Sequence, residues 1–343
     1  EYTGNLEVVN LKAVSGELSV AGVDLLLVNY PLLKQGEAQG DYTVHLAYSE
    51  RGADVAVAFN LIHPDPVLNE IFNDVRFRRA MSVAINRPEV NNLVFLDQGL
   101  PWQATINQSA SFFQQRWADA WAEYDPDLAN QLLDEMGLSE RNADGIRLRP
   151  DGEPLAFMLE YLPHEGPKKE VCELVVQYWQ AVGVQADAFG RERNYLIERL
   201  NTNTHDASGW HCDRLLERAA WTYGWNMKLG PVGDSAVMFA RAWRDWFLSN
   251  GETGVEPPEQ AKGMKQAFDD WNKTMMGTPE YMEAATKVYD LVSEALWTIG
   301  IVAGAPQPLV IKNNLENIFP PDVLSGETKY WWGAANWFFN PTQ

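Results

Sequence analysis

Residues Asn73 to Arg87 read N-D-V-R-F-R-R-A-M-S-V-A-I-N-R and form the most sharply delimited element of the sequence. Apolar side chains recur along this stretch at helical spacing, which predicts one buried stripe of an α-helix. They are Phe77, Ala80, Met81, Ala84 and Ile85. Asn73 and Asp74 are both suitable N-caps, and Pro88 blocks continuation, so the helix should end where the quoted stretch ends. Its three central arginines lie off the stripe and are expected to hold local carboxylates and helix ends.

A second helix is predicted after Tyr124, where the chain reads Y-D-P-D-L-A-N-Q-L-L-D-E-M-G to Gly137. Asp125 can cap the first turn, and Pro126 suits the first helical position because its missing N–H is not needed there. Gly137 can adopt the left-handed conformation that ends many helices.

A strand-helix-strand unit is predicted further along the chain. Leu155 to Tyr161 reads as a strand, Lys168 to Ala181 as an amphipathic helix and Val184 to Phe189 as a second strand. Such a unit is expected to cross over with right-handed topology and parallel strands. The remaining predicted elements are helices at 6–14, 24–33, 88–95, 195–200, 262–273 and 279–295, and strands at 42–46, 55–61, 207–210 and 310–312.

Length and charge limit the class of protein. The chain has 343 residues, enough for two domains of about 150 residues each. With 47 acidic and 27 basic residues the formal net charge is −20, which argues against nucleic acid as a partner because such binding depends on Lys and Arg at phosphates. The charge also disfavours an anionic membrane surface.

The two cysteines, Cys172 and Cys212, lack the spacing of a zinc or thioredoxin-type motif. They are consistent either with one disulfide or with two buried thiols. No run of about 18 apolar residues is present, so the sequence predicts no membrane-spanning helix.

The Asn73 to Arg87 stretch resembles the D-x-R-x-R-x-A-x-x-x-A-I-x-R signature of the family 5 extracellular solute-binding proteins. These receptors deliver oligopeptides, nickel chelates and some oligosaccharides to ABC importers. The Tyr124 to Gly137 stretch resembles the family's Y-D-P-x-x-A-x-x-L-L-D-E-x-G, and Trp179 to Val184 resembles W-x-x-[IV]-G-[IV]. The three phrases occur in the family's order, and the resemblance covers almost the whole chain.

The resemblance implies an α/β fold of the periplasmic-binding-protein type (type II, large cluster), with one complete lobe and part of a second. It implies residues 1–58 in the first lobe, 59–304 in the second lobe and 305–343 returning to the first. Family members usually carry further residues before this point, so we interpret the chain as the C-terminal portion of a longer receptor that binds solute weakly or not at all by itself.

The function implied is non-catalytic capture of a peptide-like or oligosaccharide solute between two lobes, without cofactor or metal. The implied partners are the permease subunits of an ABC importer, and we expect a monomer. The implied location is periplasmic or extracellular, with membrane association through the transporter or a lipid anchor outside this chain.

Aromatic residues mark the candidate ligand site. The chain contains 14 tryptophans, and aromatic faces suit sugar rings and peptide side chains alike. Trp179, Trp243 and Trp246 sit at helical spacing among apolar neighbours and are assigned to the core. The residues assigned to the ligand site are Trp102, Trp210, His211, Asp213, Trp221, Tyr223 and Trp225.

Asp213 has the most specific assignment within this set. Peptide-binding members of the family carry an acidic residue that clamps the peptide's amino group in a phrase like W-x-x-D-Y-x-D-P. Gly209 to Arg214 corresponds to that place, and Asp213 corresponds to the acidic residue. The following Tyr-x-Asp-Pro is absent, so oligosaccharide ligands stay open as the alternative.

An enzyme is the competing hypothesis. His205, His211, Cys212 and Asp213 flank one predicted strand, and a metal site or a Cys–His pair is conceivable there. Their spacing fits no known ligand set, and the sequence contains no G-x-S-x-G, H-E-x-x-H or phosphate-binding loop. A polar strand end that lines a cleft is the preferred interpretation.

Overall fold

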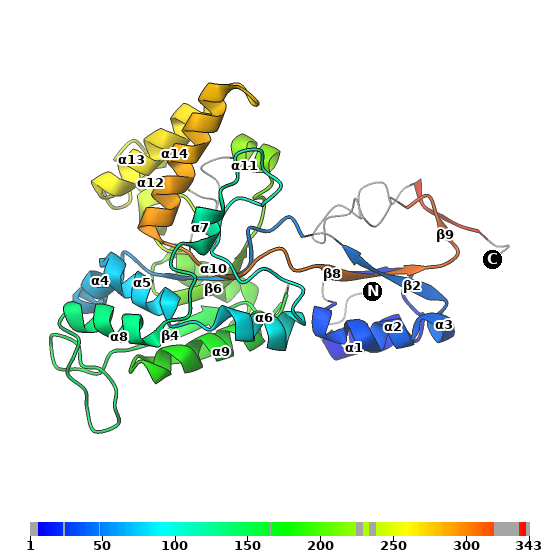
Figure 1. The fold of residues 1–343 in the computed structure, drawn as a ribbon, viewed down its shortest axis with the longest axis horizontal. Helices are drawn as coiled ribbons and strands as arrows, with labels where there is room; N and C mark the ends of the chain where they lie inside the picture. Colours follow the sequence, from blue (N-terminus) through cyan, green and yellow to red (C-terminus); the bar gives the residue numbers. More distant parts are fainter. Residues whose placement is uncertain are drawn as a thin grey trace.

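The computed structural model describes residues 6–22, 25–47, 49–164, 166–223, 229–232, 238–318 and 336–340. Two sheets organise these residues into two units that lie side by side in Figure 1. The large unit is built on a five-stranded sheet with the order β5-β4-β6-β3-β7. The small unit is built on a three-stranded sheet with the order β1-β8-β2.

The sheet of the large unit is mixed. Its strands are β3 (Ala53–Phe59), β4 (Ala156–Tyr161), β5 (Gln185–Gly190), β6 (Ala207–Cys212) and β7 (Ile299–Val302). β4 pairs in parallel with both β5 and β6, whereas β3 pairs antiparallel with β6 and β7. The parallel β4–β5 pair is connected by helix α9 (Lys168–Ala181), as the strand-helix-strand prediction required.

The quoted stretch forms parts of three helices rather than one. They are α4 (Pro66–Asn73), α5 (Val75–Val83) and α6 (Arg87–Phe95). Asp74 is extended and caps α5, its carboxylate accepting from the Arg76 N–H at 2.8 Å, so the prediction of Asp74 as an N-cap is confirmed. Asn73 is instead the last residue of α4, and its side chain donates to the Leu61 carbonyl.

The helix predicted to run to Arg87 is therefore too long. α5 ends at Val83, and Asn86 caps the next helix by accepting from the Glu89 N–H. Pro88 lies in the first turn of that helix, which is the position that proline favours. Helix α4, which the sequence analysis missed, has the same signal of a capping residue followed by a proline, since Asp65 caps it and Pro66 begins it.

Two of the three arginines of this region hold helix ends and a local carboxylate, as predicted, whereas Arg79 lies over the Trp121 ring, 4.4 Å from its centroid. Arg78 is buried and donates to the carbonyls of Phe72 and Ala295, which end α4 and the distant helix α14 (Pro279–Ala295). Arg76 pairs with Asp74 and also donates to the Glu135 carbonyl at the end of α8 (Pro126–Glu135). These contacts join four helices whose carbonyls would otherwise lack partners.

The core of the large unit contains two groups of aromatic rings. One joins the sheet to α4, α5 and α9 and consists of Phe59, Phe72, Phe77, Phe157 and Trp179. The other joins the loop before α7 (Gln115–Asp119) to α13 (Glu259–Asn272) and α14 and consists of Phe112, Trp117, Trp271, Tyr281 and Tyr289. Figure 1 shows α13 and α14 packed together at the top, away from α9.

Several other helices complete the large unit. They are α10 (Arg193–Asn201), α11 (Glu217–Tyr223) and α12 (Arg241–Leu248). Of the tryptophans assigned to the core, Trp179 and Trp243 are buried, whereas Trp246 is half-buried with Lys262 above its ring. Gly137 has a φ of 82°, the left-handed conformation expected after α8.

The small unit has its own apolar core. Its strands are β1 (Val20–Ala21), β2 (Tyr42–Ala47) and β8 (Gln307–Lys312), and its helices are α1 (Leu6–Val14), α2 (Tyr30–Gln35) and α3 (Glu37–Gly40). A predicted helix at 24–33 is replaced by a short 3₁₀ turn (Leu27–Asn29) followed by α2, because Pro31 starts a new helix in its first turn. β9 (Leu315–Glu316) and β10 (Phe338–Phe339) form a separate two-stranded ribbon.

The sheets place the two crossovers between the units at residues 49–52 and 303–306. β3 pairs with β6 and β7 inside the sheet of the large unit. The predicted boundary at residue 58 would leave most of this strand in the first lobe. Every residue of β3 is buried, so its sequence shows no alternation of apolar and polar side chains that would indicate which sheet it joins. The lobe boundaries themselves stay a prediction.

Both cysteines are buried and carry free thiols, which decides between the two alternatives left by the sequence. Burial raises the pKa of the Cys172 thiol. Among the residues that the structure describes, no helix combines the length and apolar character needed to cross a membrane.

Replacing Asp206 by asparagine is expected to destabilise the large unit by about 1–2 kcal/mol at pH 7. The Asp206 carboxylate lies 2.9 Å from His63 Nε2 and accepts from the Met158 N–H at 2.9 Å. Burial alone would raise the pKa of Asp206, but these hydrogen bonds outweigh burial and lower it. A lowered carboxyl pKa gives stability that is present above the unfolded value, about 3.9, and is lost as pH falls through the folded value.

Urea unfolding at pH 7 and near pH 3 checks this expectation. The difference between the native chain and Asp206→Asn should shrink in acid, and Asp144→Asn, at an exposed loop position, serves as the matched control. An equal difference at both pH values would contradict the assigned role of the carboxylate.

Candidate functional site

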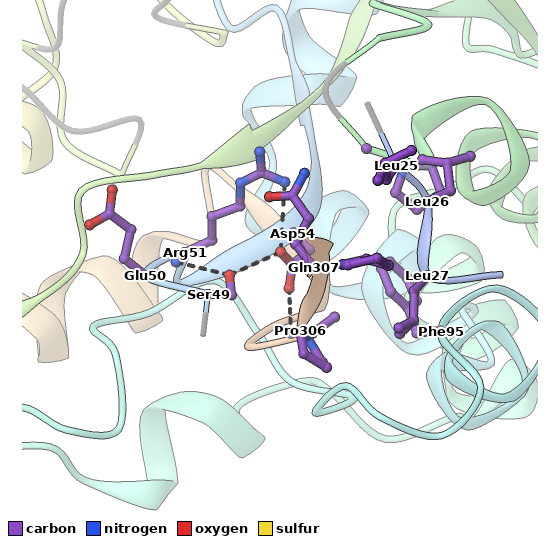
Figure 2. A pocket seen from close by; sticks show the side chains of 14 residues that line it. Leu25, Leu26, Leu27, Ser49, Glu50, Arg51, Asp54, Phe95, Pro306 and Gln307 are labelled. Atoms are coloured by element: carbon purple, nitrogen blue, oxygen red, sulfur yellow. Dashed lines mark hydrogen bonds and ion pairs between the residues drawn. The ribbon is translucent and has the colours of Figure 1, made fainter. Parts of the chain in front are cut away.

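The two crossovers enclose the candidate site. A small cavity of about 40 Å³ lies between the units and is lined by both crossovers. One wall is apolar and comes from Leu25, Leu26, Leu27 and Phe95; the other is polar and comes from Ser49, Arg51 and Asp54 (Figure 2). Gly166 and Pro167, at the start of α9, also line the cavity.

The chain after β6 reaches the same junction. β4, β5 and β6 are parallel, and ligands of α/β proteins commonly bind beyond the carboxyl ends of such strands. The Gly52 N–H of the first crossover donates to the Cys212 carbonyl at 2.9 Å. Asp213 is therefore one residue from a direct contact between β6 and the first crossover.

Strand β6 packs closely against helix α9 near its carboxyl end. A Cβ added to Gly209 would lie 2.7 Å from the Cys172 sulfur, so β6 and α9 approach each other here to a distance that only glycine permits. Sequence reasoning placed Gly209 in the family phrase but gave no role to Cys172.

Asp213 is the predicted residue with the most suitable chemistry. Its side chain is 24% exposed, and its oxygens lie 4.0 Å from His211 Nε2 and 3.6 Å from Arg214 Nε. Arg214 has a φ of 61°, a left-handed conformation that is uncommon for arginine. The candidate carboxylate thus stands beside the Arg214 guanidinium and the His211 imidazole.

Trp102 lines a second, smaller hollow of about 10 Å³ beside the first crossover. Its ring stacks on Phe113, with centroids 5.7 Å apart. Arg51 lines both this hollow and the larger cavity, so the two spaces meet at the first crossover.

The other predicted aromatic residues occupy different environments. Trp210 lies in β6 with 2% exposure and Arg193 5.5 Å from its ring centroid, so its ring faces protein in this structure. Trp221 is half-buried in α11 and donates to the Trp271 carbonyl at 3.4 Å. Tyr223 ends α11, but its side chain and all of Trp225 lie outside the described residues.

The structure does not bring the histidines and the cysteine of the enzyme hypothesis together as a catalytic or metal-binding group. His205 is buried, its Nε2 lies 2.9 Å from the Met238 carbonyl, and burial lowers its pKa. His211 and Cys212 are buried in or beside the sheet rather than open to a cavity. Within the described part of the chain, no three His, Cys, Asp or Glu side chains are grouped so as to hold a metal ion.

Sequence reasoning missed three polar residues of the junction, namely Ser49, Arg51 and Asp54. All three are buried, with exposures of 6%, 7% and 4%. The available signal is Asp54 itself, a charged residue next to a run of apolar strand residues. Such a residue is rarely buried without partners.

A profile of the bacterial extracellular solute-binding proteins, family 5, matches residues 5–213, more than half of the chain. The solved structure of an oligopeptide-binding protein OppA is 31% identical, with a TM-score of 0.71, and the match covers 94% of this chain and 52% of that one. The oligopeptide-binding protein AppA of Bacillus subtilis is 24% identical over 172 residues, which are 48% of this chain and 28% of AppA.

A more distant structure shares the fold. The periplasmic binding protein MelB of Agrobacterium fabrum, solved with stachyose, is 16% identical with a TM-score of 0.76 and is matched over 94% of this chain and 48% of its own. The chain spans less than two thirds of each of these relatives. The match to the family profile, with the fold and the order of its elements, shows that the chain belongs to the family 5 extracellular solute-binding proteins.

Proposed function

We propose that this chain contributes to the solute-binding component of an ABC importer and captures a peptide-like solute reversibly between two lobes. The observation that carries the proposal is the junction itself. Asp213, Trp102 and the first crossover meet where two sheets on separate cores are joined by only two described connections. Such a junction suits closure over a solute followed by docking on permease subunits.

Several finer properties belong to the same proposal. The protein acts without catalysis, cofactor or metal, as a monomer, in the periplasm or outside the cell. Association with the membrane occurs through the transporter or a lipid anchor. The family membership supports the location outside the cytoplasm, since family 5 proteins are extracellular solute-binding proteins.

A peptide is the favoured solute class because of the carboxylate at the end of β6. An ammonium group entering the junction would find Asp213 partly exposed and one residue from the first crossover. A charge-assisted hydrogen bond is stronger than a neutral one, and it strengthens further when the site closes and excludes water. The names of the relatives OppA and AppA, both oligopeptide-binding, agree with this class.

An oligosaccharide is the second candidate, favoured by a specific observation. Trp102 and Phe113 form a stacked aromatic pair at the hollow beside the first crossover. The Arg214 guanidinium stands 3.6 Å from Asp213, which lowers the advantage that a cationic ligand would gain there. MelB, whose structure contains stachyose, shows that this fold accommodates an oligosaccharide.

Replacing Asp213 by asparagine is expected to weaken binding of peptides with a free amino terminus by about 10- to 100-fold, the equivalent of about 1.5–3 kcal/mol for a hydrogen bond to a charged group. Titration calorimetry with a peptide series and with stachyose measures the change. The affinities are measured both for this chain and for a longer receptor polypeptide that contains it. The comparison is needed because the chain alone is expected to bind weakly.

Two controls sharpen the experiment. N-acetylated peptides should bind equally to the native protein and to Asp213→Asn, and Asp187→Asn, an exposed position on β5, should leave all affinities unchanged. Binding of stachyose without binding of peptides would favour the second candidate. Peptide affinities unaffected by Asp213→Asn would exclude the clamp.

A further inference from the structure

The first residues of β3 are irregular in a way that redirects one side chain. Ala53 pairs with Cys212 but Ala56 pairs with Trp210, so β3 has one more residue than β6 over this step. The pairing of β3 with β7 also shifts register at Val55. Such bulges bend a strand locally and change the direction of its side chains. Asp54 lies at this irregularity.

The Asp54 carboxylate contacts both crossovers between the units. It accepts from the Ser49 hydroxyl at 3.2 Å and from the Ala305 N–H at 2.8 Å, and Arg51 Nη1 lies 3.7 Å away. Ser49 and Arg51 belong to the first crossover, and Ala305 belongs to the second. Figure 2 shows the carboxylate between the two segments, with Glu50 directed away from it.

The first crossover is also connected to the large unit. The Ser49 hydroxyl accepts from the Arg51 N–H at 3.3 Å, and the Ser49 carbonyl accepts from the Asn107 side chain at 3.4 Å. The Gly52 carbonyl accepts from the Thr105 N–H at 3.4 Å. Asp54 therefore links the second crossover to a first crossover that is itself anchored.

We propose that Asp54 is a positioning residue that couples the two crossovers into one hinge and sets the angle between the units before solute binds. Two unconnected crossovers would bend independently and would permit a wider range of angles. A shared buried carboxylate favours one arrangement, because any other would separate it from its hydrogen-bond donors. The functional meaning of the hinge depends on the proposed capture of a solute, but the coupling itself does not.

The angle between the units can be measured with a pair of spin labels in the absence of solute. Gln39→Cys in α3 and Glu280→Cys in α14 place exposed thiols on the small and large unit. Both native cysteines are buried, so labelling is directed to the introduced positions. Pulsed electron–electron distance measurement then gives the distribution of distances between the units.

We expect Asp54→Ala to broaden this distribution and shift its mean, and Asp54→Asn to have a smaller effect because its oxygen still accepts from the Ala305 N–H. Ser49→Ala removes one donor and should also broaden the distribution. Asp187→Asn, away from the crossovers, should reproduce the native distribution.

Circular dichroism and urea unfolding establish which variants are folded. An unchanged distribution in folded Asp54→Ala would overturn the proposal. If that variant does not fold, unchanged distributions in both Asp54→Asn and Ser49→Ala would overturn it equally. Because no solute is present, broadening without any measurable peptide binding would support the hinge and count against the proposed function.

Discussion

Replacing Arg87 by methionine is expected to lower the free energy of unfolding by about 3–5 kcal/mol, near the upper end for a single substitution. Arg87 is completely buried and donates to the carbonyls of Gly300, Ser82 and Ala122, at 2.9, 2.9 and 3.1 Å, and to the Ser82 hydroxyl at 2.8 Å. Burial lowers its pKa to about 9, which reflects how fully the guanidinium is removed from water.

The expected loss of stability comes from the buried oxygen atoms that lose the Arg87 donor. Methionine retains much of the volume but donates no hydrogen bond, and each buried acceptor left without a partner costs about 1–3 kcal/mol, partly recovered by relaxation. Because Gly300 lies in β7, the substitution also removes a link between α6 and the sheet. Urea unfolding measured by tryptophan fluorescence gives the value.

Arg76→Met is the matched control. Arg76 has the same side chain on the neighbouring helix, but it is 42% exposed, and water can replace it at the exposed Glu135 carbonyl as well as in its ion pair with Asp74. An exposed ion pair contributes little, so this variant should unfold almost as the native chain does. Equal effects of the two substitutions would contradict the role assigned to Arg87.

Replacing Trp179 by alanine is expected to cost about 3–5 kcal/mol, the range for large buried aromatic side chains. The ring has no exposure and packs against Phe59 and Phe157, with centroids 5.5 and 5.8 Å away. Its Nε1–H donates to the Met81 carbonyl at 2.9 Å, which fixes α9 against α5.

Trp179→Phe separates packing from hydrogen bonding. Phenylalanine fills most of the space but leaves the Met81 carbonyl without its donor, so we expect a loss of about 1–2 kcal/mol. Equilibrium unfolding of both variants gives the two numbers. A loss below about 1 kcal/mol for Trp179→Ala would show that this ring is not part of the principal core.

The sequence predicted most elements of the large unit because their signals are local. α8 has a capping aspartate, a proline in its first turn and an apolar stripe, α9 has an apolar stripe, and the β4-α9-β5 unit follows from the order of these elements. The division of the quoted stretch into α4, α5 and α6 was missed because Asp74 both ends α4 and caps α5, and Asn86 caps α6 shortly after α5 ends at Val83. Adjacent caps of this kind look like one continuous helix when only the apolar stripe is read.

The candidate site was less predictable, for a physical reason. Asp213 and Trp102 were identified from a family phrase and from aromatic character, but Ser49, Arg51 and Asp54 depend on a contact between residues about 250 positions apart in the sequence. No local pattern indicates that Asp54 would accept from the Ala305 N–H. The burial of Trp210 likewise follows from its position inside a mixed sheet, whose strand order the sequence does not specify.

Native mass spectrometry of the complete receptor with one defined pentapeptide tests the central claim most directly, since it reports capture and catalysis together. The account predicts a one-to-one complex from which the pentapeptide is released with unchanged mass, and a weaker complex for Asp213→Asn. Release of peptide fragments, or no complex with the peptide at any concentration that saturates a related receptor, would contradict reversible, non-catalytic capture of a peptide-like solute.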